Sequence, residues 1–173
     1  MRFPVYKYGL FFRLVEETDA AFILDLRTNK NLARHLTSTD DDLQKQVEWI
    51  REYKTREKSQ KEYYFLFEDE NHQPSGVVRL YDINDDTYTS GSWLAKPGSD
   101  EFLSIKSDLF ISDFAAEELK GKKCVFDVRK KNKKVLRYHK MFSTVIGEDD
   151  LNYYFTIDEE NALRKYNFLK SII

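Results

Sequence analysis

The sequence predicts a mixed α/β fold in which a mostly antiparallel sheet is flanked by helices. Two observations lead to this class. Short runs of aromatic and aliphatic residues, such as 62–68 and 76–83, are typical of strands. Longer segments, such as 103–119, repeat apolar residues at helical spacing. With 173 residues, 41% of them hydrophobic, we expect one domain over 1–173 with a substantial core.

The first predicted elements are a strand and two helices. Residues 8–15 mix aromatic and aliphatic side chains, as a first strand does, and Thr18-Asp19 marks the start of a helix. Ser38-Thr39 is a stronger start, because a hydroxyl can cap the open amides and the carboxylates of 40–42 lie at the positive end of the dipole. The helix behind it is amphipathic, with apolar residues at Leu43, Val47, Trp49, Ile50 and Tyr53.

Three strands, joined by turns, are expected next as an antiparallel meander at 62–68, 76–83 and 88–96. The remaining elements are a helix over 103–119, a strand at 123–128, a helix over 132–142, a strand pair around 147–149 that closes with 151–157, and a helix over 158–169. The helix over 103–119 ends at Gly121, a common C-terminal stop. This order gives a sheet of about seven strands.

Charge and cysteine content exclude several classes of protein. The net charge is −2 and the charged residues are evenly split, so no single-signed field favours a nucleic-acid or membrane partner. Cys124 is the only cysteine, which rules out an intrachain disulfide and favours a reducing compartment, so we expect a cytoplasmic location. No spacing of His, Cys and carboxylate residues suggests a metal site.

Two segments carry a resemblance to a known family. The segment FFRLVEETDAAFILDLR is similar to the opening of GNAT acetyltransferases, where an Arg closes the first strand and an Asp starts the first helix; here these are Arg13 and Asp19. The segment NKKVLRYHKMF resembles the family's motif-B helix, which begins with an Asn, here Asn132. The resemblance covers essentially the whole chain. It implies a GNAT fold, splayed between strands four and five, and an N-acetyltransferase that uses acetyl-CoA.

The family's fold implies where the pantetheine arm of acetyl-CoA docks. Splayed strands leave backbone groups of strand four unpaired, and the arm pairs with them as a short extra strand would. Strand four corresponds to 88–96 here. The implied partners are the main-chain groups of Trp93, Leu94, Ala95 and Lys96. For the Trp93 side chain itself, a place in the core is the stronger interpretation.

The coenzyme diphosphate is expected at the N-terminus of the helix over 103–119, where open amides favour an anion. This sequence departs from the family there, because Phe102 and Ser104 stand about where the family has two glycines. Asp100 and Glu101 add unfavourable charge. The side chains that could compensate are those of Ser104, Lys106 and Ser107.

Asn132 and His139 lie two helical turns apart and therefore share a face of their helix. The resemblance implies that Asn132 contacts the pantetheine arm, although a plain helix cap is an equal alternative. His139 stands where many family members have a Tyr that protonates the departing thiolate. That role predicts a raised pKa for His139, whereas a half-buried packing residue is the alternative.

The acceptor is expected to be a small-molecule amine. The NKKVLRYHKMF pattern looks closest to GNAT members that act on nucleotide-linked amino sugars. A nucleotide diphosphate could pair with Arg34, Arg79 or Arg27, and His35 faces the usual acceptor side. Candidates for a base by location are Asp82, Asp85 and Asp86, for which a role as turn residues is the stronger interpretation.

Two other functions remain open at this point. One is an acetyltransferase of protein N-termini or lysines, for which the sequence identifies no peptide groove. The other is a non-catalytic coenzyme-binding or interaction module that kept the fold and lost its glycine loop. The chain could also form a homodimer.

Overall fold

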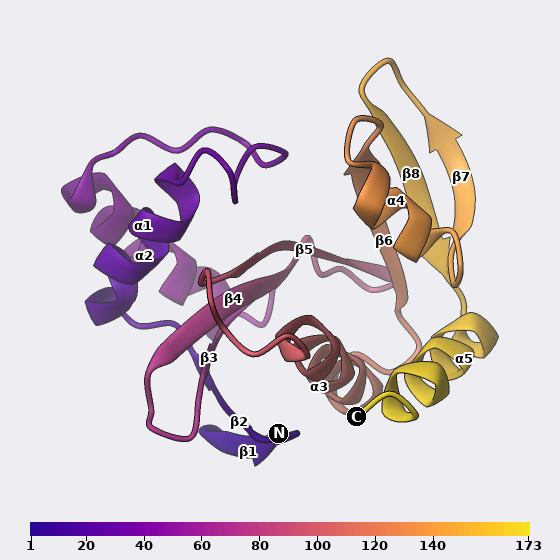
Figure 1. The fold of residues 1–173 in the computed structure, drawn as a ribbon, viewed down its shortest axis with the longest axis horizontal. Coiled ribbons are helices and arrows are strands. Elements are labelled where there is room, and N and C mark those ends of the chain that lie inside the picture. The colour runs from indigo at the N-terminus through magenta and orange to yellow at the C-terminus, as the bar shows by residue number, and fades with distance from the viewer.

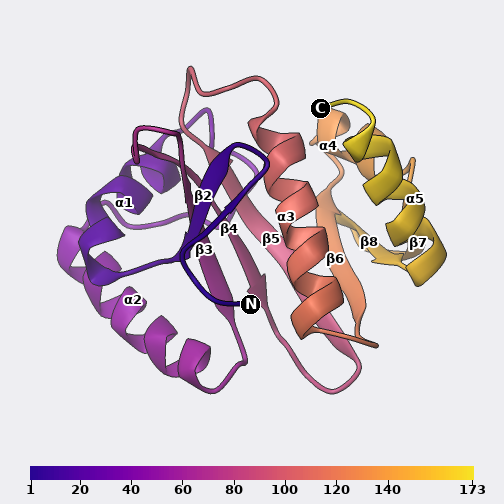
Figure 2. The same cartoon turned by 90° about the horizontal axis from the view of Figure 1, so that it is seen from below.

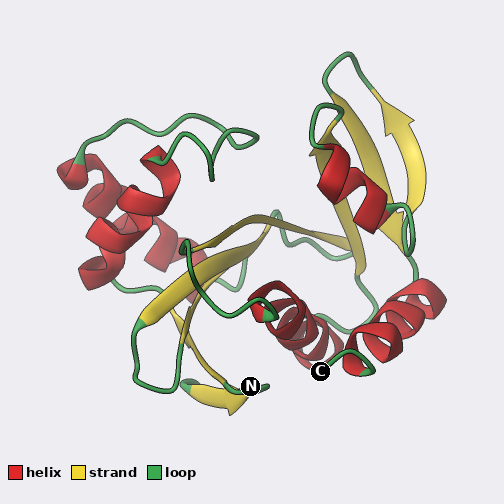
Figure 3. Cartoon of the chain, viewed as in Figure 1, coloured by secondary structure: helices red, strands yellow, loops and turns green.

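The computed structural model describes residues 1–173 and contains eight strands and five α-helices (Figures 1 and 3). In chain order the elements are β1 (Val5–Lys7), β2 (Leu10–Leu14), α1 (Ala20–Thr28), α2 (Leu43–Lys58), β3 (Tyr63–Glu68), β4 (Pro74–Tyr81), β5 (Thr87–Ala95), α3 (Leu103–Glu118), β6 (Lys123–Arg129), α4 (Lys133–His139), β7 (Thr144–Glu148), β8 (Asn152–Ile157) and α5 (Glu159–Lys170). The predicted order of elements is confirmed, with one strand added at the N-terminus.

The strands form one sheet in the order β1-β2-β3-β4-β5-β6-β8-β7. Every neighbouring pair is antiparallel except β5 and β6, which are parallel. The added strand β1 joins β2 through Tyr8 and Gly9, whose φ angles of 55° and 76° fit a tight hairpin turn. Three residues are too few to show an alternation, which is why the sequence pattern did not reveal β1.

Helices cover the two faces of the sheet (Figure 2). Because strand side chains alternate between faces, neighbouring residues of β3 join different cores. Leu66 packs on one face with Ile23 of α1 and Ile50 of α2. Phe65 packs on the other face in a cluster that includes Phe110 of α3. Each core therefore holds one helical layer against the sheet.

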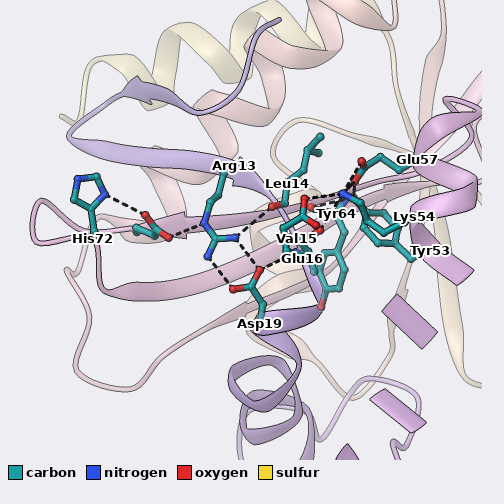
Figure 4. A network of polar contacts seen from close by, with 11 residues as sticks. Arg13, Leu14, Val15, Glu16, Asp19, Tyr53, Lys54, Glu57, Tyr64 and His72 are labelled. Carbon is teal, nitrogen blue, oxygen red and sulfur yellow. Dashed lines mark hydrogen bonds and ion pairs between the residues drawn. The ribbon is translucent and has the colours of Figure 1, made fainter. Parts of the chain in front are cut away.

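The turn from β2 into α1 is fixed by Arg13 (Figure 4). Its guanidinium donates to both carboxylate oxygens of Asp19, at 2.7 and 2.8 Å, and its Nε donates to Glu68 of β3 at 2.7 Å. The same Asp19 accepts the backbone amide of Glu16 at 2.8 Å. The Arg and Asp that carry the family resemblance are thus a structural pair of a half-buried Arg13 and a buried Asp19, and this pair sets the direction of the chain.

Helix α2 begins later than the sequence predicts. Its N-cap is Asp42, whose side chain accepts the amide of Lys45 at 3.1 Å. The expected cap at Ser38-Thr39 is wrong, because the Thr39 hydroxyl instead accepts the Nε of Arg27 at 2.7 Å. Residues 29–42 therefore form a long connection between α1 and α2, tied back to α1 by Arg27.

The C-terminal third turns away from the main sheet (Figure 1). Strands β6, β8 and β7 carry α4 over a small core of Val128, Leu136 and Phe155. Cys124 is buried at the start of β6, and burial raises the pKa of its thiol to about 11. No helix of the structure combines the length and the apolar character that a bilayer crossing requires.

Candidate active site

Strands β5 and β6 separate soon after they meet. Only Thr87 with Lys123 and Tyr88 with Cys124 are in register, although β5 continues to Ala95. From Tyr88 onward the strands diverge into the V seen in Figure 1. The edge of β5 that faces β6 therefore has backbone groups without a strand partner, and such groups seek one. The predicted splay between the fourth and fifth strands of the expected sheet is confirmed.

A bulge distorts β5 inside this opening. Gly91 lies opposite Arg79 and Leu94 opposite Val77, so two residues of β5 face one residue of β4. The first residue of the bulge, Ser92, has a φ of 52°, a backbone conformation that is unusual for a residue with a side chain. The bulge turns the peptide groups of this stretch out of the regular ladder.

The four predicted pantetheine contacts occupy different surroundings. The indole of Trp93 crosses to α3, where Nε1 donates to the hydroxyl of Ser107 at 2.9 Å. Leu94 is buried in the core beside α1 and α2, and Ala95 packs against the core beside α3. The amide of Lys96 already donates to Ser75 at 2.8 Å.

The N-terminus of α3 is occupied by Asp100. One carboxylate oxygen accepts the amide of Phe102 at 2.7 Å, and the other pairs with Lys106. The hydrogen bond from Lys106 is the main reason why the pKa of Asp100 is lowered. A cavity of about 420 Å³ lies at this end of the helix, with Lys96, Gly98 and Lys106 among its lining residues. An incoming diphosphate would have to displace Asp100 from the amide and from Lys106.

The two predicted serines of this region differ in exposure. Ser104 is exposed at the start of α3. Ser107 is fully buried, and its hydroxyl accepts from Trp93 and donates to the carbonyl of Ser104 at 3.2 Å. The Ser107 side chain is therefore engaged in packing α3 against β5.

Helix α4 places its two predicted functional residues in different settings. Asn132 is the N-cap and accepts the amide of Val135 at 3.5 Å, which agrees with the cap interpretation. The ring of His139 lies 4.5 Å from that of Phe126 and 6.3 Å from that of Phe155. Burial and then the charge of Lys165 lower the pKa of His139 to about 4. In the ligand-free protein the pKa of His139 is therefore lowered rather than raised, and the ring is neutral at pH 7.

Tyr138 is a second candidate proton donor on α4 that the sequence interpretation missed. Its hydroxyl donates to Asp108 of α3 at 2.6 Å, and Asp108 also pairs with Lys165 at 2.6 Å. Burial raises the pKa of Tyr138, so the phenol stays protonated at neutral pH. Tyr138 immediately precedes His139, which was chosen as the proton donor by counting two helical turns from Asn132. A search for any phenol next to that position would have found Tyr138.

The opposite face of the sheet contains a cavity of about 310 Å³ under the α1–α2 connection. Two of the three predicted arginines, Arg27 and Arg79, line it. Arg34 does not, and its Nε donates to Nε2 of His35 at 3.2 Å. Burial and then the charges of Arg34 and Arg129 lower the pKa of His35. Other lining residues include Thr37, Ser38, Thr39, Lys45, Gln46, Trp49 and Tyr64.

The β4–β5 connection carries the aspartates considered as bases. Asn84 organises this turn by accepting the amides of Asp86 and Thr87, each at 2.9 Å. Asp82 has a φ of 52°, and the carbonyl of Asp85 accepts Nζ of Lys122. These contacts agree with the interpretation of the three aspartates as turn residues. The structure contains no group of three or more His, Cys, Asp or Glu side chains arranged to hold a metal ion.

Comparisons with known proteins agree with this geometry. The protein-family model described as an acetyltransferase (GNAT) domain matches residues 10–141 of this chain. The solved structure of apo FdhC, described as a nucleotide-linked sugar GNAT, is 32% identical, with a TM-score of 0.83 and 97% of each chain covered. No curated protein matches the sequence.

Two further solved structures share the fold at lower identity. Spermidine N-acetyltransferase from Vibrio cholerae, in complex with CoA and spermine, is 19% identical with a TM-score of 0.75, covering 90% of this chain and 98% of its own. Ribosomal-protein-S5-alanine acetyltransferase from Vibrio fischeri is 14% identical with a TM-score of 0.75, covering 90% and 97%. The family match and the similarity to FdhC together show that the chain belongs to the GNAT acetyltransferase family.

Proposed function

We propose that the protein transfers an acetyl group from acetyl-CoA to the primary amine of a nucleotide-linked amino sugar. The observation that carries the proposal is the open edge of β5 beyond Tyr88, where a strand-like arm can pair with free backbone groups. The acceptor class rests on the 32% identity to FdhC, a nucleotide-linked sugar GNAT, over 97% of both chains.

In this proposal the coenzyme lies between β5, α3 and α4. Backbone groups from Trp93 to Lys96 contact the pantetheine arm, and Asn132 approaches it from α4. Lys106 and Ser104 contact the diphosphate once Asp100 has released the first turn of α3. The amine nitrogen attacks the thioester carbonyl from the other face of the sheet and the C–S bond breaks. The new amide nitrogen gives up one proton to solvent, and the leaving sulfur takes up one.

The proton for the sulfur is proposed to come from α4. His139 is the predicted donor, but its low pKa leaves very little imidazolium at pH 7. Tyr138 is the stronger alternative, because its phenol is protonated across the working range. If Tyr138 donates, Tyr138→Phe should lower kcat roughly 10²-fold while His139→Phe changes it little. The reverse pattern would assign the proton to His139.

The acceptor is tested with a panel of amines at saturating acetyl-CoA. Nucleotide-linked amino sugars should show the highest kcat/KM, ahead of polyamines, aminoglycosides and N-terminal peptides. A peptide or spermidine that is acetylated much faster than every sugar nucleotide would overturn the acceptor class. Release of free CoA without any acetylated amine would not count as transfer, so the product should be followed by mass.

A non-catalytic module is the second candidate, and one observation favours it. The carboxylate of Asp100 already occupies the amide and the lysine that a diphosphate would use. A protein that had lost the coenzyme could keep this arrangement permanently. Absence of any binding of acetyl-CoA at millimolar concentration would favour this candidate over the enzyme.

A further inference from the structure

The cavity under the α1–α2 connection contains a buried hydroxyl without an acceptor. Tyr64 of β3 is 1% exposed, and its hydroxyl donates to no group of the chain, although the Arg27 guanidinium lies beside it. Its backbone amide is fixed by the hydroxyl of Tyr53 at 3.0 Å, so the ring is held in place. A buried hydroxyl left unsatisfied is unfavourable, and such groups usually have a ligand or water as partner.

The same cavity holds a cation without an acidic partner. Arg27 donates to the hydroxyl of Thr39 at 2.7 Å and to the carbonyl of Thr37 at 3.4 Å, and no carboxylate pairs with it. Arg79, by contrast, pairs with the buried Glu62 at 2.7 Å, a carboxylate that it shares with Arg56. Lys45 pairs with Asp40 at 2.7 Å. The guanidinium of Arg27, which has no carboxylate partner, thus lines the cavity beside the hydroxyl of Tyr64.

The donors converge from three elements. Arg27 comes from α1, Thr37 and Ser38 from the connection to α2, and Tyr64 from β3. Donors arriving from several directions suit a tetrahedral anion better than a planar carboxylate, which a single arginine can bind with two parallel hydrogen bonds. The volume of about 310 Å³ lies at the lower end of the range for small-molecule sites.

The cavity lies on the face of the sheet from which the acceptor must approach. Tyr64 is directly opposite Arg79, and Arg79 is directly opposite Gly91, so their side chains share one face. Gly91 immediately precedes the bulge in β5. The ring of Tyr81 lies 4.7 Å from the Arg79 guanidinium and extends this surface toward the splay.

We propose that the cavity formed by Arg27, Tyr64 and the hydroxyls of Thr37 and Ser38 binds a phosphate group of the acceptor. This inference rests on the proposed function, and it identifies which residues recognise the nucleotide part of the substrate. The guanidinium of Arg27 and the hydroxyl of Tyr64 donate to phosphate oxygens. The phosphate contributes to acceptor binding and stays remote from the bond that is made.

Direct binding tests the site without any catalysis. Uridine diphosphate and inorganic pyrophosphate should raise the melting temperature of the wild-type protein. Arg27→Gln should weaken their binding at least about tenfold, because it removes a charge-assisted contact. Arg51→Gln is the matched control, since Arg51 is an exposed arginine of α2 that pairs with Glu17 outside the cavity. Equal binding to wild type and Arg27→Gln would overturn the inference.

Tyr64→Phe gives a signature that a purely structural residue would not. Removing an unsatisfied buried hydroxyl should raise the melting temperature of the ligand-free protein, while the binding of pyrophosphate weakens. A lower melting temperature together with unchanged pyrophosphate binding would show that Tyr64 acts only in packing, and would contradict its assigned role.

Kinetics identify the source of the phosphate. Arg27→Gln should raise KM for a nucleotide-linked amino sugar, with kcat, KM for acetyl-CoA and the rate with the free amino sugar unchanged. An unchanged KM for the sugar nucleotide, despite weakened pyrophosphate binding, would assign the site to free phosphate and overturn the acceptor role. If pyrophosphate binds through Arg27 but no sugar nucleotide is acetylated, the proposed acceptor fails while the anion site remains.

Discussion

Arg13 shows how one residue can determine the entry of the chain into the fold. Its guanidinium contacts two carboxylates that are themselves almost buried, since Asp19 is 6% and Glu68 is 9% exposed. Burial of a charge without its partner is strongly unfavourable. The Arg-to-Asp spacing that suggested the family therefore has a structural cause, which is the neutralisation of these two acids.

We predict that Arg13→Met lowers the free energy of unfolding by about 3–5 kcal/mol, because two buried carboxylates lose their cation. Urea denaturation at pH 7 measures this change. The control Arg51→Met removes an exposed partner of Glu17 and should cost about 1 kcal/mol or less. A loss for Arg13→Met as small as that of the control would show that the pair contributes little.

His139 gives a prediction about pH. The pKa of the His139 ring is about 4 in the folded protein, below the ordinary value of 6.5 that applies in the unfolded chain. Between these values the unfolded state binds more protons, so lowering the pH from 6.5 toward 4 should destabilise the wild type. His139→Phe should lose this component, and its urea midpoint should fall less between pH 7 and pH 5.

The control for this comparison is Leu163→Ala, which alters an exposed apolar residue of α5 and keeps His139. It should retain the pH dependence of the wild type. An NMR titration of the His139 ring provides an independent readout, because the ring should stay neutral down to about pH 5. A midpoint near 6.5 would show that the ring is not desolvated.

At the scale of elements, most of the fold could be predicted because long segments carry their period in the sequence. The helix over 103–119 corresponds to α3 (Leu103–Glu118), and the strand at 62–68 to β3 (Tyr63–Glu68). The start of α2 could not be predicted from composition alone. Four consecutive residues from Thr39 to Asp42 can all act as caps, and the choice of Asp42 depends on Arg27, which engages Thr39 from another helix.

The N-terminus of α3 leads to a prediction about coenzyme affinity. Asp100 occupies the amide of Phe102 and pairs with Lys106, both of which an incoming diphosphate would need. Asp100→Ala should therefore lower KM for acetyl-CoA by roughly 3–10-fold, because a competing anion is removed from the helix terminus. Glu101→Ala removes the same charge from the neighbouring exposed position and should have a smaller effect. A higher KM for Asp100→Ala would mean that Asp100 orders the loop for the coenzyme.

At the scale of the whole molecule, the site was only partly predictable. The splay follows from the family resemblance, and counting along the helix found His139. The pKa of His139 depends on the rings of Phe126 and Phe155, which reach it from two strands distant in sequence. The cavity of Arg27 and Tyr64 likewise unites segments that only the fold brings together. A side-chain environment that is built from segments distant in sequence leaves no local sequence pattern from which it could be predicted.

The C-terminal edge of the molecule predicts self-association. All five residues of β7 are exposed at the end of the sheet, with Val145 at 44% and Ile146 at 58%, and Leu163 of α5 is 60% exposed. An exposed apolar edge strand favours pairing with another chain. We predict a homodimer of twice the 20.7 kDa chain mass by light scattering, and a monomer for Ile146→Asp. A wild-type monomer at tens of micromolar would contradict this, and Leu43→Asp on α2 serves as the control.

We predict that the open edge between β5 and β6 is a docking site for acetyl-CoA in an active enzyme. Isothermal titration of acetyl-CoA into the purified protein tests it most directly, because it requires no knowledge of the acceptor. We expect one site per chain with a micromolar dissociation constant and a matching rise in melting temperature. Adenosine diphosphate, which lacks the pantetheine arm, should bind more weakly. The absence of both heat and a melting shift at millimolar acetyl-CoA would contradict it.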